Sequence, residues 1–367
     1  MNGEIIFLRL LDAGRSIDLS EPALLFPRLP IEQIIKTKDT PSYVIFPKPM
    51  IIEVKGDISY KSDYVKELRI LAKIYEDGII SLLARMRFTD TPLEELHNFK
   101  KVTFFTSDGE FNIKNLLEFH SNKIFNQIRP YINEENYDLN HHEEYTIFCL
   151  TDEIENPRDL IDNNKKYFAS LLMGENPLLN LHDNQINNTL NHTFSFLKND
   201  LVVFDFERCL IIDPNCDYED ILLITEIANY QLLELRSLDY LVDKRISLVE
   251  SDIHTIYFKS RAIFKRLNKR VGRLLRLRHD LTFLLENIEN ISKLIGDYYL
   301  SQIYTYLANL FELKHWSDSI RHRIDTLGDI YNISHTNINE KILLYVEILL
   351  SFIFIMEFVF LILDFFK

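Results

Sequence analysis

Apolar and polar residues alternate through the segment ELRILAKIYEDGIISLLARMRF (67–88). Apolar side chains occupy every second position from Leu68 to Ile74, and again from Leu82 to Phe88. Asp77 and Gly78 lie between the two runs and suit a tight turn, because glycine tolerates a positive φ. The pattern predicts a β-hairpin with one buried face and one solvent-exposed face.

A second hairpin is predicted in HTFSFLKNDLVVFDFERCLIID (192–213), with its turn at Asn199 and Asp200. Further strands are expected in EIIFLRLL (4–11), YVIF (43–46), KVTFF (101–105) and EYTIFCL (144–150). Short helices are expected in PLEELHNF (92–99) and KKYFASLLMG (165–174), and polar linkers in NEENYDLNHHEE (133–144) and HDNQINNTLN (182–191). These elements indicate an N-terminal mixed αβ region of two halves, each built around a hairpin.

The period of the apolar positions changes to that of a helix from Tyr218 onward. A helix is expected to begin after Pro214, since YEDILLITEIANYQLLELRSLDYLVDKRI (218–246) starts with acidic residues and contains neither Gly nor Pro. Two further helical regions follow, from Ile256 to Gly296 and from Asp297 toward the end, with Gly328 as a weak point. Long helices with little intervening loop favour an antiparallel coiled-coil hairpin.

The C-terminal segment 342–363 is far more apolar than the rest. Of its 22 residues, 17 are Leu, Ile, Val or Phe. As a helix it would extend about 33 Å, roughly the thickness of a bilayer's hydrocarbon core. A transmembrane helix is therefore predicted, although a buried helix of a soluble domain is the alternative.

The predicted fold class is α+β, with antiparallel hairpins first, a long helical hairpin next and one C-terminal transmembrane helix last. The expected boundaries are 1–190 for the αβ region, 191–255 for a β-hairpin plus helix, 256–341 for the helical hairpin and 342–363 for the membrane helix. A near-neutral mean hydropathy of −0.08 fits a globular protein with a single such helix.

Acidic residues interrupt the apolar segment at helical spacing. Glu340 and Glu347 are seven residues apart, and Ser351 follows Glu347 by one helical turn. Glu357 is the second acid inside the segment. We interpret Glu340, Glu347, Ser351 and Glu357 as an association face between copies of the chain, with an ion path or carboxylates that reach the membrane interface as alternatives.

One strongly basic segment, KSRAIFKRLNKRVGRLLRLR (259–278), contains nine Lys or Arg and no acid, in a chain of net charge −14. It predicts a partner-binding face for RNA or for anionic lipid headgroups. The alternative is a solvated helix face paired with acids such as Glu219, Asp220, Glu226, Glu234 and Asp239. The residues of the predicted face are Arg261, Lys265, Arg266, Lys269, Arg270, Arg273, Arg276 and Arg278.

Candidate chemistry elsewhere is sparse. The run His141-His142-Glu143-Glu144 offers metal ligands, but neighbouring side chains diverge, so a solvated linker is the preferred interpretation. No phosphate-binding glycine loop or nucleophile motif is present, so neither a catalytic residue, a cofactor, a metal nor a small-molecule substrate is predicted. Cys149, Cys209 and Cys216 lack CxxC spacing and are expected to be free thiols.

The N-terminal sequence MNGEIIFLRLLDAG shows neither a signal peptide nor a transit peptide. Together with the apolar C-terminal segment, this predicts a tail-anchored protein, with a single C-terminal membrane pass and the bulk of the chain in the cytoplasm.

Several stretches of the C-terminal third resemble the "required for meiotic nuclear division" family. They are LLRLRHDL (274–281), IYTYLANLFELKHWSDSIRHRIDTLGDIYN (303–332), the residues His335, Thr336 and Glu340, and, further upstream, NDLVVFDFERCLI (199–211). Two positions differ, since Lys341 replaces an aromatic residue and ISKLIGDYYL replaces a Pro-Glu-aromatic element. The resemblance implies a membrane-tethered, oligomeric protein without catalytic activity.

A more distant likeness is to CorA-type magnesium channels, which also join an αβ domain to long helices that enter the membrane. The segment NINE (337–340) is similar to that family's polar entry segment, but neither a second span nor a Gly-Met-Asn loop follows it. The expected function is therefore a membrane-tethered homo-oligomeric scaffold that binds a ribosome, RNA or a partner complex through 259–278. A CorA-like divalent-cation channel is the alternative.

Overall fold

The computed structural model describes residues 1–14, 16–20, 31–32, 49–54, 58–133, 141–176, 181–258, 279 and 297–365. The chain divides into two compact units. The first contains Met1–Ser237 and Asn287–Lys314, and the second contains Leu238–Glu286 and His315–Lys367.

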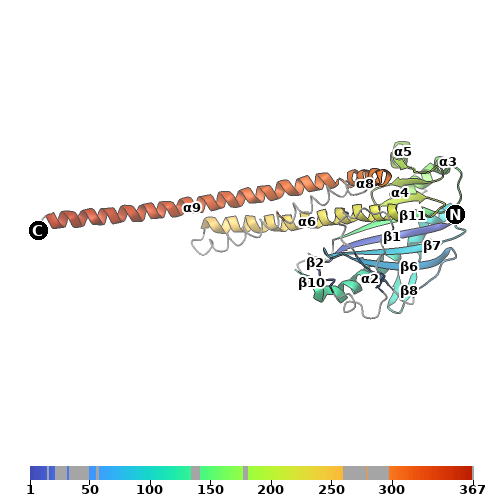
Figure 1. Cartoon of the computed structure of the whole chain (residues 1–367), viewed down its shortest axis with the longest axis horizontal. Helices are drawn as coiled ribbons and strands as arrows, with labels where there is room; N and C mark the ends of the chain where they lie inside the picture. The colour runs from blue at the N-terminus through green and yellow to red at the C-terminus, as the bar shows by residue number, and fades with distance from the viewer. Residues whose placement is uncertain are drawn as a thin grey trace. The chain divides into compact units, whose positions relative to one another are not determined.

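Within the described part of the first unit, nine strands form one sheet (Figure 1). Only β11 and β14 pair in parallel among these strands; the other neighbours are antiparallel. In spatial order the strands are β12 (Thr193–Phe194), β13 (Leu201–Phe204), β14 (Arg208–Ile212), β11 (His142–Leu150), β1 (Gly3–Asp12), β7 (Ile79–Phe88), β6 (Val65–Ile74), β4 (Met50–Glu53) and β3 (Ile31–Glu32).

Two small sheets and a set of helices complete the described elements. The small sheets pair β2 (Ser16–Ile17) with β10 (Ile132–Asn133), and β8 (Phe104–Thr106) with both β5 (Ser59–Tyr60) and β9 (Gly109–Phe111). The helices are η1 (Leu93–Lys101), α2 (Ile113–Ile128), η2 (Arg129–Tyr131), α3 (Pro157–Asn163), α4 (Lys165–Met173), α5 (Asp183–Leu190), α6 (Glu219–Phe258), α8 (Tyr298–Leu310) and α9 (Leu313–Phe365).

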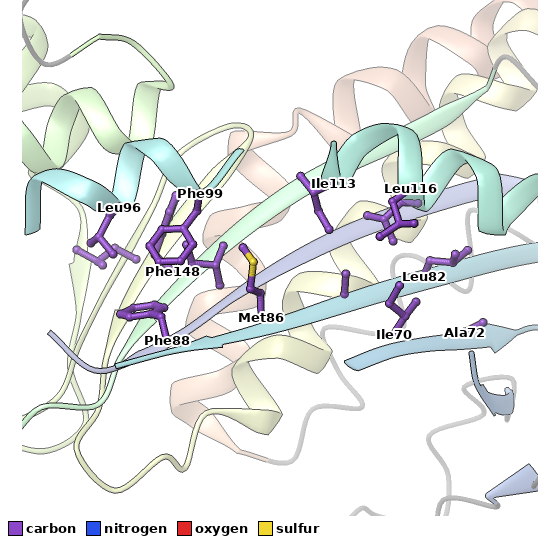
Figure 2. Close-up of a cluster of buried hydrophobic side chains, with 14 of the residues drawn as sticks. Ile70, Ala72, Leu82, Met86, Phe88, Leu96, Phe99, Ile113, Leu116 and Phe148 are labelled. Atoms are coloured by element: carbon purple, nitrogen blue, oxygen red, sulfur yellow. The ribbon is translucent and has the colours of Figure 1, made fainter. Parts of the chain in front are cut away.

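One face of the large sheet packs against η1 and α2 to α5. Figure 2 shows Leu96 and Phe99 of η1 above Phe88 and Phe148 of the sheet, and Ile113 and Leu116 of α2 above Ile70 and Leu82. All these side chains are buried, which removes a large apolar area from water and stabilises this layer.

The opposite face of the sheet packs against the first half of α6 and the residues around α8. Tyr145 of β11 meets Phe311 edge to face, with ring centroids 6.1 Å apart. Leu8 and Leu10 of β1 are buried on this face, and Ala228 and Leu232 of α6 are also buried. The sheet is therefore enclosed by helices on both sides.

The predicted hairpin at 67–88 is confirmed as β6 and β7, with Gly78 in the turn at φ 98°. The prediction that its second face is exposed to solvent holds at Arg69 and Arg87 but is wrong at Ser81, which hydrogen-bonds to α6, and at Leu83, which is buried. The hairpin at 192–213 is confirmed at β12 and β13, and β14 adds a third strand. Both hairpins belong to one sheet, so the expectation of two separate halves is wrong.

Other local predictions have mixed outcomes. The strands expected at 4–11 and 144–150 are β1 and β11, and the helix expected at 165–174 is α4. The expected linker 182–191 is instead α5, and the linker expected up to residue 144 is β11 from His142 onward. The strand expected at 43–46 lies outside the described residues.

The first long helix is confirmed as α6, which begins shortly after Pro214 as predicted. A break at Glu312, with φ 54°, separates α8 from α9, and α9 continues through Gly328 without interruption. Most of the segment 256–296, which was expected to form one arm of a helical hairpin, lies outside the described residues.

The predicted fold class is wrong in its membrane helix and in its division into hairpins. The protein has a mixed α/β fold with one large, mostly N-terminal sheet. Among the described residues, none of the helices combines the length and apolar character needed to cross a bilayer. The predictions of a transmembrane helix and of a tail anchor at 342–363 are therefore wrong. Glu347 and Glu357 leave only nine residues between them, about 14 Å of helix, against a hydrocarbon core of about 30 Å.

Candidate functional site

The C-terminal part of α9 exposes a large apolar surface in the second unit. Every side chain from Leu343 to Val359 is exposed in the isolated chain. The large apolar residues with 42–70% exposure are Leu343, Leu344, Tyr345, Val346, Ile348, Leu349, Leu350, Phe352, Ile353, Phe354, Ile355, Met356, Phe358, Val359 and Ile362. We call these fifteen residues the α9 apolar segment.

The polar residues of this part of α9 gather on one side. At about 100° per residue, Ser351 lies about 40° from Glu347 around the helix, and Glu357 lies about 80° from it in the other direction. The arc that contains Glu347, Ser351 and Glu357 is therefore about 120° wide. Glu340 falls within the same arc by its position in the helix, although its side chain is not described. The remaining arc of about 240° is apolar.

The eight residues of the predicted basic face, 261–278, lie outside the described residues. Three of the acids suggested as their partners are ion-paired with other residues. Glu219 pairs with Arg85 at 2.7 Å, Glu226 pairs with Lys73, and Asp239 pairs with Arg323. The alternative interpretation, in which these acids neutralise the basic segment, is not tested, because residues 259–278 lie outside the described residues.

The candidate metal run 141–144 is taken up by contacts within the protein. Glu144 pairs with Arg9 and with Lys114, the latter at 2.9 Å, and Glu143 pairs with Arg236 at 2.6 Å. Across the described ranges, no group of three or more His, Cys, Asp or Glu side chains is placed to hold a metal ion. Through these ion pairs, the two carboxylates link β11 to β1, α2 and α6.

A buried polar network between the sheet and α6 was missed at the sequence level. Glu226, only 2% exposed, accepts hydrogen bonds from Ser81 at 2.6 Å and from Tyr75 at 3.3 Å, in addition to its ion pair with Lys73. In the sequence, Lys73 and Ser81 mark the polar face of the hairpin. Such a face has the same pattern whether it lies in water or packs against polar groups of a helix, so the network could not be identified from the sequence.

A second polar network joins the start of α6 to β1. Glu4 accepts two hydrogen bonds from Arg85, at 2.5 and 3.1 Å, and one of 2.8 Å from the hydroxyl of Tyr218. Burial raises the pKa of the Tyr218 hydroxyl, so it stays protonated and can donate.

Three carboxyl groups lie together near the turn of the first hairpin. Burial raises the pKa of Asp12 to about 6, and burial and the charge of Asp12 raise that of Asp77 to about 6. Burial, with the charges of both aspartates, also raises the pKa of Glu234. Tyr230 donates a hydrogen bond to Asp77, so part of this cluster is satisfied internally.

The cysteines are free, as expected. Cys149 and Cys209 are buried, and their burial raises the thiol pKa values well above the usual range, whereas Cys216 is exposed. A buried thiol that stays protonated is a poor nucleophile. The two buried cysteines therefore act as core residues.

Comparison with known proteins gives one family and one relative. The family described as "Uncharacterized protein MJ0711, N-terminal domain" matches residues 2–219. The relative, uncharacterized protein MJ0711 of Methanocaldococcus jannaschii, is 26% identical over 233 residues, which are 63% of this chain and 70% of the relative. No solved structure matches the chain.

These comparisons correct the resemblances inferred from short motifs. Neither the meiotic nuclear division family nor a CorA-like protein is indicated. The misleading stretches at 274–281 and 303–332 mix apolar and charged residues at helical spacing and lie beyond the residues that the family model matches. Such patterns are common on packed helices, so they carry little information about ancestry.

Proposed function

The chain belongs to the family of the MJ0711 N-terminal domain, and on this premise we propose that it is a self-associating scaffold without catalytic activity. The observation that carries the proposal is the α9 apolar segment, defined above, which is exposed in the isolated chain. Monomeric proteins rarely expose so large a contiguous apolar surface, and such surfaces mark interaction sites.

The width of the apolar arc favours several copies of the chain over a single partner helix. A two-stranded coiled coil buries a narrow stripe on each helix, whereas the apolar arc of α9 is about 240° wide. In a parallel bundle of at least three copies, each helix contacts two neighbours, and the arc with Glu347, Ser351 and Glu357 faces water. Eleven of the fifteen apolar side chains then face the neighbouring helices, whereas Leu343, Leu350, Phe354 and Phe358 lie in the water-facing arc with the carboxylates.

The apolar area available for burial can be compared with that of known stable interfaces. A large apolar side chain has about 60–120 Å² to bury. The eleven residues of the α9 apolar segment outside that arc, roughly half exposed, would therefore remove on the order of 500 Å² per copy from water. Stable interfaces bury about 800 Å² per partner.

Binding of a partner by the scaffold is assigned in this proposal to the basic segment 259–278. Its nine Lys or Arg residues without an acid favour contact with a polyanion, and RNA is the polyanion we propose. Replacement of Arg266, Lys269, Arg270 and Arg273 by Gln should abolish RNA recovery with the purified protein. RNA recovered in unchanged amount would refute this element and leave self-association untouched.

Sedimentation velocity of the full chain tests self-association. We expect a trimer or larger species, and a monomer when Phe352→Lys and Met356→Lys place two charges in the middle of the apolar arc. Glu347→Lys, the matched control, adds the same side chain to the polar arc and should leave the assembly intact. A monomeric full chain, equal disruption by the control, or a monomer bound to lipid or detergent would overturn the proposal.

A further inference from the structure

Three carboxyl groups from three separate elements meet at the end of the first hairpin. They belong to Asp12 at the end of β1, Asp77 in the hairpin turn and Glu234 on α6. The backbone N–H of Ala13 donates a 2.9 Å hydrogen bond to the carbonyl of Gly78, which holds the end of β1 against the turn. The cluster therefore lies where a strand end, a tight turn and a helix come together.

The stretch 230–237 of α6 presents one side to this cluster. Tyr230, Glu234 and Ser237 follow one another at spacings of four and three residues, so they share a side of the helix. The hydroxyl of Tyr230 donates a hydrogen bond to Asp77. This stretch of α6 is thus attached to the hairpin turn through the cluster.

The acids of the cluster lack the ion pairs that carboxylates have elsewhere along the interface of α6 with the sheet. There, Glu226 pairs with Lys73, and Glu143 pairs with Arg236 at 2.6 Å. Among the described residues, no Lys, Arg or His nitrogen lies within 4.0 Å of any of the three clustered carboxylates. The contact of 230–237 with the turn is therefore not held by opposite charges.

The other titratable groups around the cluster add no positive charge. Glu76, beside Asp77 in the turn, contributes a further negative charge that acts on it. Tyr75 keeps its proton, because burial raises the pKa of its hydroxyl. From α6, Tyr230 and Ser237 contribute hydroxyl groups. If all three carboxyls ionise, like charges therefore face one another with little water between them, which is unfavourable.

The hydrogen bonds of the cluster are incomplete. Asp12 accepts a 3.1 Å hydrogen bond from the backbone N–H of Gly14. Oδ2 of Asp77 accepts from Tyr230, whereas its Oδ1 is buried and finds no donor among the described residues. The hydroxyl of Ser237, only 4% exposed, also makes no hydrogen bond of ordinary geometry, although it lies near Asp12. A proton on a neighbouring carboxyl would supply the donor that Oδ1 lacks.

We propose that Asp77 and Glu234 share a proton that holds residues 230–237 of α6 on the hairpin turn, and that loss of this proton releases them. With the proton in place, the carboxyl O–H of Glu234 donates to Oδ1 of Asp77, and the pair carries a single negative charge. Without it, two carboxylates face each other and Asp12 adds a third, so repulsion opens the contact. The self-association of α9 plays no part in this switch.

The directions of the pKa shifts agree with this assignment. Burial raises the pKa of Asp12 and of Asp77 to about 6. Burial, followed by the charges of Asp77 and then Asp12, raises the pKa of Glu234. Because these pKa values lie above the ordinary ones, the contact is complete at low pH and is lost as the pH rises through about 6.

The release is expected to be local, because the preceding turns of α6 are held differently. Glu226 pairs with Lys73 and accepts a 2.6 Å hydrogen bond from Ser81. Ser237 is the last α6 residue of the first unit. The shared proton therefore controls the last two turns of α6 that belong to this unit and leaves the earlier turns attached to the sheet.

Hydrogen exchange of the full chain between about pH 5 and about pH 8, corrected for the intrinsic rate at each pH, tests the proposal. Protection of amides 230–237 should fall roughly tenfold or more across this range, the effect of about one pKa unit or more. Protection of amides 221–228 should stay within about twofold, because the ion pair of Glu226 holds them. Constant protection of 230–237, or an equal fall at 221–228, would overturn the proposal.

A matched pair of variants identifies the proton. Glu234→Gln should keep 230–237 protected at every pH, because its amide N–H donates to Asp77 and does not titrate. Glu76→Gln makes the same change on an exposed side chain beside Asp77 and should keep the pH dependence. Equal pH dependence in the two variants would contradict the assignment of the proton to Glu234.

A direct measurement in the unaltered chain does not rely on a variant that folds. NMR of the carboxyl carbons should show Asp77 and Glu234 titrating together, above their ordinary range, because one proton serves both groups. Independent titration of the two carboxyls at ordinary values, about pH 4, would overturn the proposal.

Discussion

The hydroxyl of Ser81 donates a 2.6 Å hydrogen bond to Oε1 of Glu226, which ties β7 to α6 across 145 positions of the sequence. Oε2 of the same carboxylate pairs with Lys73 of β6, whose side chain is only 14% exposed. One carboxylate therefore satisfies a hydroxyl and an ammonium group on two neighbouring strands. The sheet and the helix are fixed in register by this contact.

Glu226→Ala should destabilise the first unit strongly. The substitution leaves the Lys73 ammonium buried without a counter-ion and the Ser81 hydroxyl without its acceptor, at a cost of about 3 kcal/mol. The measurement is the urea dependence of unfolding, with hydrogen exchange of the β7 amides to localise the effect. Glu219→Ala is the control, because its side chain is 64% exposed and its ion pair with Arg85 contributes less than about 1 kcal/mol.

A double variant separates the ion pair from general damage to the fold. Lys73→Met combined with Glu226→Met removes both charges and keeps apolar volume, so it should recover most of the stability lost in Glu226→Ala. Equal losses in the double variant and in Glu226→Ala would show that packing, and not the unpaired ammonium, sets the cost.

The carboxyl cluster near the hairpin turn predicts a specific pH dependence of stability. Asp12 and Asp77 have pKa values of about 6 in the folded protein, above the ordinary value of 3.8. Folding therefore takes up protons between about pH 4 and pH 6. The stabilising contribution is complete below about pH 4 and is lost as the pH rises through about 6, so the free energy of unfolding falls across this window.

Asp12→Asn should raise stability at pH 7 and flatten the pH profile between pH 4 and pH 6. The amide keeps an oxygen that can accept the 3.1 Å hydrogen bond from the backbone N–H of Gly14, but it carries no buried charge. Urea unfolding at several pH values measures the effect. Asp18→Asn is the control, because hydrogen bonds from Ser20 lower the pKa of Asp18, and its removal should bring no gain at pH 7. A steeper profile in Asp12→Asn would contradict the prediction.

Local pattern predicted the elements whose neighbours in sequence are also neighbours in space. The alternation from Leu68 to Phe88 located β6, β7 and their turn, since one face is continuously apolar and Gly78 permits the turn. The same alternation misled at Ser81, whose hydroxyl faces the buried carboxylate of Glu226 on α6 and not water. The pattern cannot distinguish these two environments.

Long-range pairing was beyond the reach of local pattern. The parallel contact of β11 with β14 joins Thr146 to Arg208, with three helices between them in the sequence. That contact unites both hairpins in one sheet. In the C-terminal region, the apolar residues of α9 were recognised as unusual, but their pattern alone did not identify what covers them.

The thiols should differ sharply in reactivity. Cys216 is exposed and should react with a maleimide within minutes in the native protein. Cys149 and Cys209 are buried, with raised thiol pKa values, and should react only when the sheet opens. Mass spectrometry of the labelled protein counts the modified sites, and Cys216→Ser should abolish the fast phase. Fast labelling of three sites in the native state would contradict the buried positions of Cys149 and Cys209.

Arg323 should stabilise the second unit through a bidentate contact. Its guanidinium donates to Asp239 and to Asp243, which are one helical turn apart on α6. Because a single planar group satisfies two carboxylates, Arg323→Gln should lower stability by about 1–2 kcal/mol and increase hydrogen exchange around residue 239. Arg321→Gln is the matched control, since Arg321 lies 3.9 Å from Asp318 within the same exposed helix face, and should cost less than about 0.5 kcal/mol. Similar exchange in the two variants would mean that the contact with α6 contributes no more than an ordinary surface pair.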